Sequence, residues 1–79
     1  MQRVALVTGA ARGLGEVIAR RLHAAGLRVA LADLNEDAVQ RLADELDPEG
    51  RSALGLKLDA REKADFERAR DVIAERWGG

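Results

Sequence analysis

The strongest restriction on the fold comes from a glycine-rich segment that stands between an apolar run and a helical pattern. Residues 4–7, Val-Ala-Leu-Val, form a continuous apolar run, which is typical of a parallel strand covered on both faces. The segment 8–15, Thr-Gly-Ala-Ala-Arg-Gly-Leu-Gly, follows it directly. Beyond it the apolar residues recur at helical spacing, namely Leu14, Val17, Ile18, Leu22 and Ala25, and Gly26 stands where a helix-ending glycine belongs. These residues predict a strand, a glycine turn and a helix, in that order.

The same order of strand and helix recurs twice more. Residues 28–32, Arg-Val-Ala-Leu-Ala, are the second strand candidate, which ends at Asp33, and Asn35 is a good N-cap for a helix with an apolar stripe. After a turn at 47–50, residues 53–58 predict a third strand, whose alternation places it near a sheet edge. From Arg61 onward a third helix is expected, with its apolar stripe at Phe66, Ala69, Ile73 and Trp77. The chain is therefore predicted to be α/β: a three-layer Rossmann-type half, βαβαβα with a parallel sheet.

Composition excludes several classes of protein. Thirteen Lys and Arg against fourteen Asp and Glu give a net charge of −1, which argues against nucleic acid or an anionic membrane as a main partner. The absence of cysteine excludes a disulfide framework and a thiolate metal site. No apolar run approaches the roughly 20 residues that span a bilayer, and no signal peptide is evident. We expect a soluble, cytoplasmic chain, with a thin core because 15 of its residues are alanine.

The glycines and one acid carry the chemistry. A pyrophosphate at a helix N-terminus needs free backbone N–H groups and a surface without obstructing Cβ atoms. Gly9 permits the tight turn out of the strand, Gly13 lets the backbone approach the phosphates, and Gly15 lets the helix pack close to the strand. Asp33 follows 18 residues after Gly15, near the separation expected for a carboxylate that binds the adenosine ribose. The pattern predicts a dinucleotide site.

The Thr-Gly-x-x-x-Gly-x-Gly spacing, together with Asp33 and the Leu58-Asp59 pair, resembles the short-chain dehydrogenases/reductases over the whole chain. The resemblance implies that Asp33 holds the ribose hydroxyls and that Leu34 lies beside the adenine. It also implies that Asp59 contacts the adenine amino group, with Ala60 next to it. The pyrophosphate and ribose would be lined by Gly9, Arg12, Gly13, Leu14 and Gly15.

The resemblance stops short of the family's chemistry. Family members continue into a fourth strand and later supply a catalytic serine and a Tyr-x-x-x-Lys pair, whereas this sequence has no tyrosine and its one serine is Ser52. We therefore interpret residues 1–79 as the N-terminal part of an NAD(P)-binding Rossmann domain, truncated before the fourth strand. The chain alone is expected to be inactive. Alternatives are a free-standing nucleotide-binding or interaction module and an incomplete piece of a longer protein.

The expected partner is a dinucleotide, NAD rather than NADP, because Asp33 would repel a 2′-phosphate although Arg12 would attract one. Self-association, or association with a missing C-terminal half of the parent, is expected through the first strand. Simpler interpretations stay open: Asp33 as an ordinary strand-end acid, Arg12 as a solvated cation and Asp59 as the N-cap of the third helix. His23 is expected on a solvated helix face, and Trp77 is expected to pack in the core.

Overall fold

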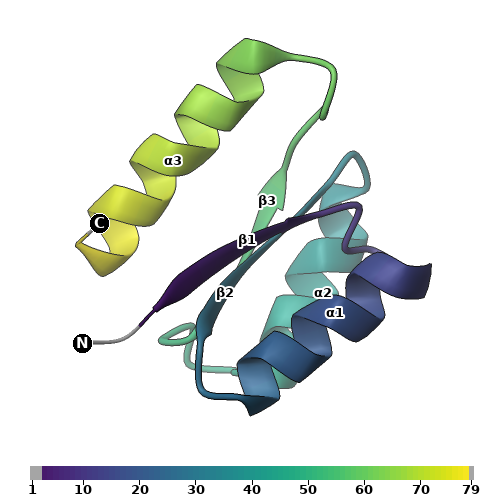
Figure 1. Ribbon diagram of the computed structural model, residues 1–79, viewed down its shortest axis with the longest axis vertical. Helices are drawn as coiled ribbons and strands as arrows, with labels where there is room; N and C mark the ends of the chain where they lie inside the picture. Colours follow the sequence, from purple (N-terminus) through teal and green to yellow (C-terminus); the bar gives the residue numbers. More distant parts are fainter. Residues whose placement is uncertain (1–2, 79) are drawn as a thin grey trace.

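Three strands alternate with three helices in the computed structural model, which describes residues 3–78 (Figure 1). The sheet order is β1-β2-β3 and both strand pairs are parallel, as predicted. The elements are β1 (Val4–Thr8), α1 (Gly13–Ala24), β2 (Arg28–Asp33), α2 (Glu36–Leu46), β3 (Ala53–Lys57) and α3 (Lys63–Trp77). The third strand pairs with β2 alone within residues 3–78, which confirms its predicted place at a sheet edge.

The central position of β2 in the sheet explains why its sequence is apolar without alternation. Its neighbours pair in register on both sides, with Val7 opposite Leu31 on β1 and Gly55 opposite Leu31 on β3. The four residues 29–32 have no exposed surface. A parallel strand that is covered on both faces must be apolar at every position, and this run is.

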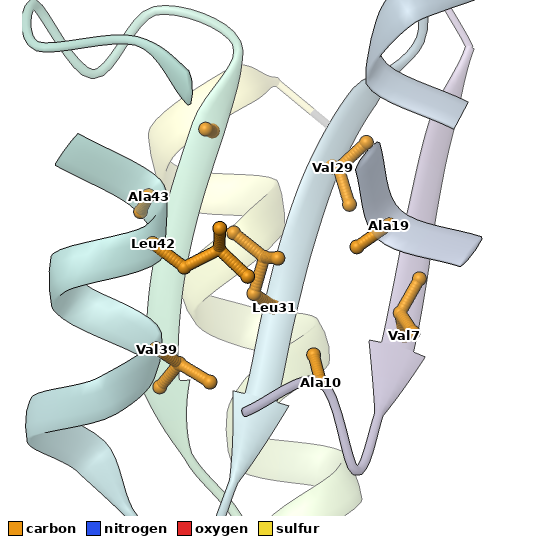
Figure 2. Packing of buried hydrophobic residues seen from close by; sticks show 9 residues of the cluster. Val7, Ala10, Ala19, Val29, Leu31, Val39, Leu42 and Ala43 are labelled. Atoms are coloured by element: carbon orange, nitrogen blue, oxygen red, sulfur yellow. The ribbon is translucent and has the colours of Figure 1, made fainter. Parts of the chain in front are cut away.

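The helices cover both faces of the sheet, α1 and α2 on one and α3 on the other (Figure 1). The larger cluster of buried side chains lies under α1 and α2 (Figure 2); it consists of Val7, Ala10, Ala19, Val29, Leu31, Val39, Leu42, Ala43 and Ala53. The smaller lies under α3 and consists of Ala32, Leu58 and Ala69, with Leu56 packed against it. The three-layer prediction is confirmed.

Two predicted apolar stripes are only partly buried. On α3, Ala69 reaches the core, but Phe66 is 37% exposed because a helix that meets the sheet mainly through one alanine leaves its other side chains outside. On α1 the core contacts come from Ala19 and Leu22. The remaining residues of that predicted stripe, Leu14, Val17, Ile18 and Ala25, are exposed, the last of them just beyond the end of the helix.

Polar side chains fix the ends of α2. Asn35 is the N-cap, as predicted, since its Oδ1 accepts a hydrogen bond from the N–H of Ala38 at 3.1 Å. Beyond the helix, the Asp47 carboxylate accepts hydrogen bonds from the backbone of Glu49, Arg51 and Ser52 and from the Ser52 hydroxyl at 2.7 Å. The Ser52 bond is the main cause that lowers the pKa of Asp47 below its usual value. The turn before β3 is therefore held by one carboxylate.

His23 was expected on a solvated face, and this expectation is wrong. Its Nε2 lies 2.9 Å from the Ser52 hydroxyl oxygen and its ring is half-buried. Because Ser52 donates its proton to Asp47, His23 donates to Ser52, and the contact ties α1 to the turn before β3.

Trp77 is half-buried, with the Arg28 guanidinium carbon 6.0 Å from its ring centre. Within residues 3–78, no helix is long and apolar enough to cross a membrane, and no group of His, Cys, Asp or Glu could hold a metal ion.

Candidate dinucleotide-binding cleft

The carboxyl ends of the three parallel strands meet at one edge of the sheet and border an open cleft. The cleft has a volume of about 290 Å³ and is lined by Thr8, Gly9, Asp33, Leu34, Leu58, Asp59, Ala60 and Arg61. Each strand contributes residues at or just beyond its carboxyl end, so chain segments far apart in the sequence become neighbours. In open α/β sheets this edge is where ligands bind.

The turn between β1 and α1 needs glycine for two distinct reasons. Gly9 and Gly13 have φ of 65° and 64°, in the left-handed region that other residues rarely adopt. Gly15 lacks room instead: a Cβ built there would lie 2.1 Å from the carbonyl oxygen of Gly9. The close approach predicted for Gly15 is therefore confirmed, although its partner is the turn after the strand rather than the strand itself.

The start of α1 lies beside this turn. Arg12 occupies the N-cap position with φ −165° and makes no side-chain cap, and the helix begins at Gly13. The first N–H groups of a helix have no partner within the helix and attract an anion. Arg12, Gly13 and Leu14 are exposed and flank the cleft rather than line it.

Asp33 joins the end of β2 to the glycine turn. Its Oδ2 accepts from the N–H of Ala11 at 3.2 Å, and its Oδ1 accepts from the N–H of Asn35 at 2.9 Å. The N–H of Ala10 donates to the carbonyl of Ala32 at 3.0 Å, so the turn is fastened to β2 twice. A carboxylate oxygen has two acceptor positions, and one on each Asp33 oxygen is left by these contacts.

Asp59 was given two interpretations that could hold together, adenine contact and N-cap of the third helix, and the structure excludes the second. The N-cap of α3 is Glu62, so Asp59 is not the cap of that helix. Its carboxylate instead pairs with Arg61, whose Nε lies 3.0 Å from Oδ1 and whose Nη2 lies 2.9 Å from Oδ2. Hydrogen bonding to the Arg61 guanidinium lowers the pKa of Asp59 to about 2. The third helix consequently starts at Lys63, two residues later than predicted.

Five of the nine predicted site residues line the cleft, and four lie at or beside the start of α1. The five are Gly9, Asp33, Leu34, Asp59 and Ala60; the four are Arg12, Gly13, Leu14 and Gly15. Thr8, Leu58 and Arg61 also line the cleft and were not predicted. Thr8 and Leu58 directly precede the predicted residues Gly9 and Asp59, so their positions were implied by the sequence. Nothing in the sequence indicated Arg61 except its position two residues after Asp59.

The family model described as short chain dehydrogenase matches residues 3–79. This chain belongs to the short-chain dehydrogenase family. A sorbitol dehydrogenase from Cereibacter sphaeroides of the same family is 37% identical over 76 residues, which are 96% of this chain and 28% of that protein.

Solved structures of short-chain dehydrogenases superpose closely on the chain. One from Burkholderia phymatum, in complex with NAD, has a TM-score of 0.87 at 31% identity and covers 98% of this chain and 27% of that one. A 3-ketoacyl-(acyl-carrier-protein) reductase from Brucella melitensis, complexed with NADH, has a TM-score of 0.85 at 33% identity, covering 96% of this chain and 30% of that one. The chain thus spans less than a third of the length of these short-chain dehydrogenases.

Proposed function

We propose that this chain supplies the adenosine- and pyrophosphate-binding part of an NAD-dependent oxidoreductase of the short-chain dehydrogenase type. The observation that carries the proposal is the Asp33 carboxylate, which lies in the cleft beside the glycine turn and has one acceptor position left on each oxygen. The vicinal hydroxyls of a ribose offer two donors at matching separation. Asp33 would therefore accept both of them.

The remaining parts of a dinucleotide fit the surroundings of Asp33. The pyrophosphate would lie at the start of α1, where Gly9 and Gly13 keep side chains away from the backbone N–H groups. The adenine would enter the cleft between Leu34 and Ala60, with Asp59 at its amino group. When bound, the nicotinamide of such a cofactor would accept or donate a hydride; the residues described here would bind and orient its other end.

The choice of NAD over NADP rests on charge at Asp33. A 2′-phosphate would replace one donating hydroxyl by an anion against a carboxylate that already uses half of its acceptor positions. Arg12 is exposed at the N-cap of α1 and does not line the cleft, so its attraction for the phosphate is weakened by solvent. The solved relatives that contain NAD and NADH support the same choice.

The Tyr-x-x-x-Lys pair to which the resemblance assigns proton transfer does not occur in this sequence. The sequence has no tyrosine, and Ser52 precedes β3, at the end of the strand away from the cleft, where it donates to Asp47. We therefore assign the chain binding rather than proton transfer. A nucleotide-binding module without chemistry is the alternative that this observation favours.

Calorimetric titration with NAD and NADP tests the proposal. The protein should bind NAD more tightly, and Asp33→Asn, which removes the charge but keeps an acceptor for the turn, should narrow or reverse the preference. Arg51→Ala removes an exposed charge remote from the cleft and is the control. Equal affinities in the unaltered protein would contradict the assignment. NADH formation from an alcohol by the 79-residue chain, above a boiled control, would contradict the binding-only role.

A further inference from the structure

Arg61 is the one cationic side chain that lines the cleft within residues 3–78. Its side chain is 83% exposed, so it is not there to fill the core. Its Nε and Nη2 both point at Asp59, and its backbone N–H donates to Asp59 Oδ1 at 3.0 Å. The guanidinium thus donates two parallel hydrogen bonds to a carboxylate in the cleft. This arrangement fixes the plane of the carboxylate and stabilises its ionised form.

The backbone at Asp59 is held independently of its side chain. Its N–H donates to Asp65 Oδ2 at 2.8 Å, in the first turn of α3. Asp65 is itself paired with Arg68 at 2.6 Å, and the hydrogen bond from the Asp59 backbone is the main cause that lowers the pKa of Asp65. With the backbone fixed by α3 and the carboxylate fixed by Arg61, Asp59 keeps little conformational freedom of its own.

The contacts determine how many donors a ligand can bring to Asp59. A carboxylate offers about four acceptor positions, two on each oxygen. Arg61 fills both on Oδ1, through its backbone N–H and Nε, and one on Oδ2, through Nη2. One position remains, on Oδ2. Asp33, by contrast, keeps one on each oxygen. Asp33 can therefore accept from both hydroxyls of a diol, whereas Asp59 can accept from one N–H.

We propose that Arg61 is a positioning residue that orients the Asp59 carboxylate for one N–H of a 6-aminopurine, so that the cleft discriminates adenine from hypoxanthine. The inference rests on the proposed function and deepens it. Hypoxanthine carries a carbonyl oxygen in place of the amino group. That oxygen would face the free position on Oδ2 and find an acceptor instead of a donor. Without the Arg61 side chain only the backbone N–H of residue 61 would hold the carboxylate, which could then rotate and lose most of the discrimination.

The test compares the dissociation constants of NAD and nicotinamide hypoxanthine dinucleotide by calorimetry. The unaltered protein should prefer the adenine form by about tenfold, the effect of one hydrogen bond to a charged group. Arg61→Ala should reduce the preference to about twofold, chiefly by weakening NAD binding. Arg61→Lys should fall between them, because a lysine keeps the charge but not the two parallel bonds.

A double-mutant cycle separates positioning from a general structural effect. In an Asp59→Ala background, adding Arg61→Ala should change the adenine preference no further, because the residue through which Arg61 acts is gone. Arg51→Ala, a cation of similar exposure paired with Glu49 at 3.2 Å, is the matched control and should keep the full preference. Circular dichroism confirms that each variant is folded.

The outcomes distinguish this inference from the function on which it rests. If Arg61→Ala keeps the full preference, or weakens both dinucleotides equally, the positioning role is wrong and the cofactor site stands. If the unaltered protein binds neither dinucleotide, the proposed function is overturned, and the role of Arg61 with it.

Discussion

Replacing Gly15 by alanine would place a methyl group inside the backbone of the turn that borders the cleft. The new Cβ would lie 2.1 Å from the carbonyl oxygen of Gly9 and 2.7 Å from its carbonyl carbon. Because distances under 3.0 Å are essentially never seen for a Cβ, α1 and the turn would have to separate by roughly 1 Å. Both obstructing atoms belong to the backbone, so a side-chain rotation cannot relieve the contact.

The expected loss of stability follows from two opposing effects. Overpacking of this kind costs typically 1–3 kcal/mol, and we take about 3 kcal/mol because backbone must move. Alanine is favoured over glycine inside a helix by about 1 kcal/mol, which offsets part of the cost. Gly15→Ala should therefore lower the free energy of unfolding by about 2 kcal/mol, a large fraction for so small a chain.

Urea denaturation followed by circular dichroism at 222 nm measures the effect. Val17→Ala is the matched control: Val17 is on the same helix and 46% exposed, so its truncation should change the free energy of unfolding by no more than about 0.5 kcal/mol. NAD affinity should fall with Gly15→Ala as well, since the turn that is proposed to receive the pyrophosphate would be displaced. A Gly15→Ala protein as stable as its parent would refute the close approach of helix and turn.

Three further predictions concern other parts of the chain. The Asp59 carboxyl, followed by carbon NMR, should stay ionised until about pH 2, and in Arg61→Ala its pKa should rise toward the ordinary value of about 4, because the guanidinium is lost while the backbone N–H of residue 61 still donates. Because the folded pKa is the lower one, its contribution to stability is complete above about pH 4 and is lost as the pH falls toward 2; titration near 4 in both proteins would contradict this. Asn35→Ala should destabilise the fold by about 1 kcal/mol in urea, and Asn35→Asp, which can still cap, should not. The outer edge of β1 has no partner strand within residues 3–78, so sedimentation of the chain should show self-association as concentration rises; a monomer that persists at millimolar concentration would contradict this.

The strands and the binding residues at their ends were predictable because their signals are local. The run at 29–32 is apolar at every position, and only burial on both faces explains such a pattern. Asp33 could be placed in the cleft because parallel strands deliver their carboxyl ends to the same edge. Gly15 could be identified from its spacing alone, since close packing of a helix start on the preceding turn depends on a few neighbouring residues.

The errors concern contacts between segments that periodicity does not describe. Phe66 has the spacing of a core residue. However, α3 packs on the sheet through Ala69, which contacts Ala32 and Leu58, and this leaves Phe66 partly exposed. In the structure His23 contacts Ser52, which lies 29 residues away in the sequence, and no pattern within one helix indicates such a contact. Asp59 had the right residue type for a cap, but its carboxylate accepts from the backbone and guanidinium of Arg61, and the helix begins only after Glu62.

The two hydrogen bonds that fasten the glycine turn to β2 bear on any attempt to redesign cofactor use. Ala11 donates to the same carboxylate that is proposed to select the ribose, so in that proposal residue 33 would both choose the cofactor and hold the turn. A substitution chosen only to admit a 2′-phosphate, such as Asp33→Ala, would also remove one of the two hydrogen bonds that hold the turn proposed to receive the pyrophosphate, leaving the backbone bond from Ala10 to Ala32. Variants of this kind should lose affinity for both cofactors while their ratio changes. A change of preference from NAD to NADP would then need a short, uncharged side chain with a hydrogen-bond acceptor at residue 33. Such a side chain would alter the cofactor preference and still accept from the N–H of Ala11.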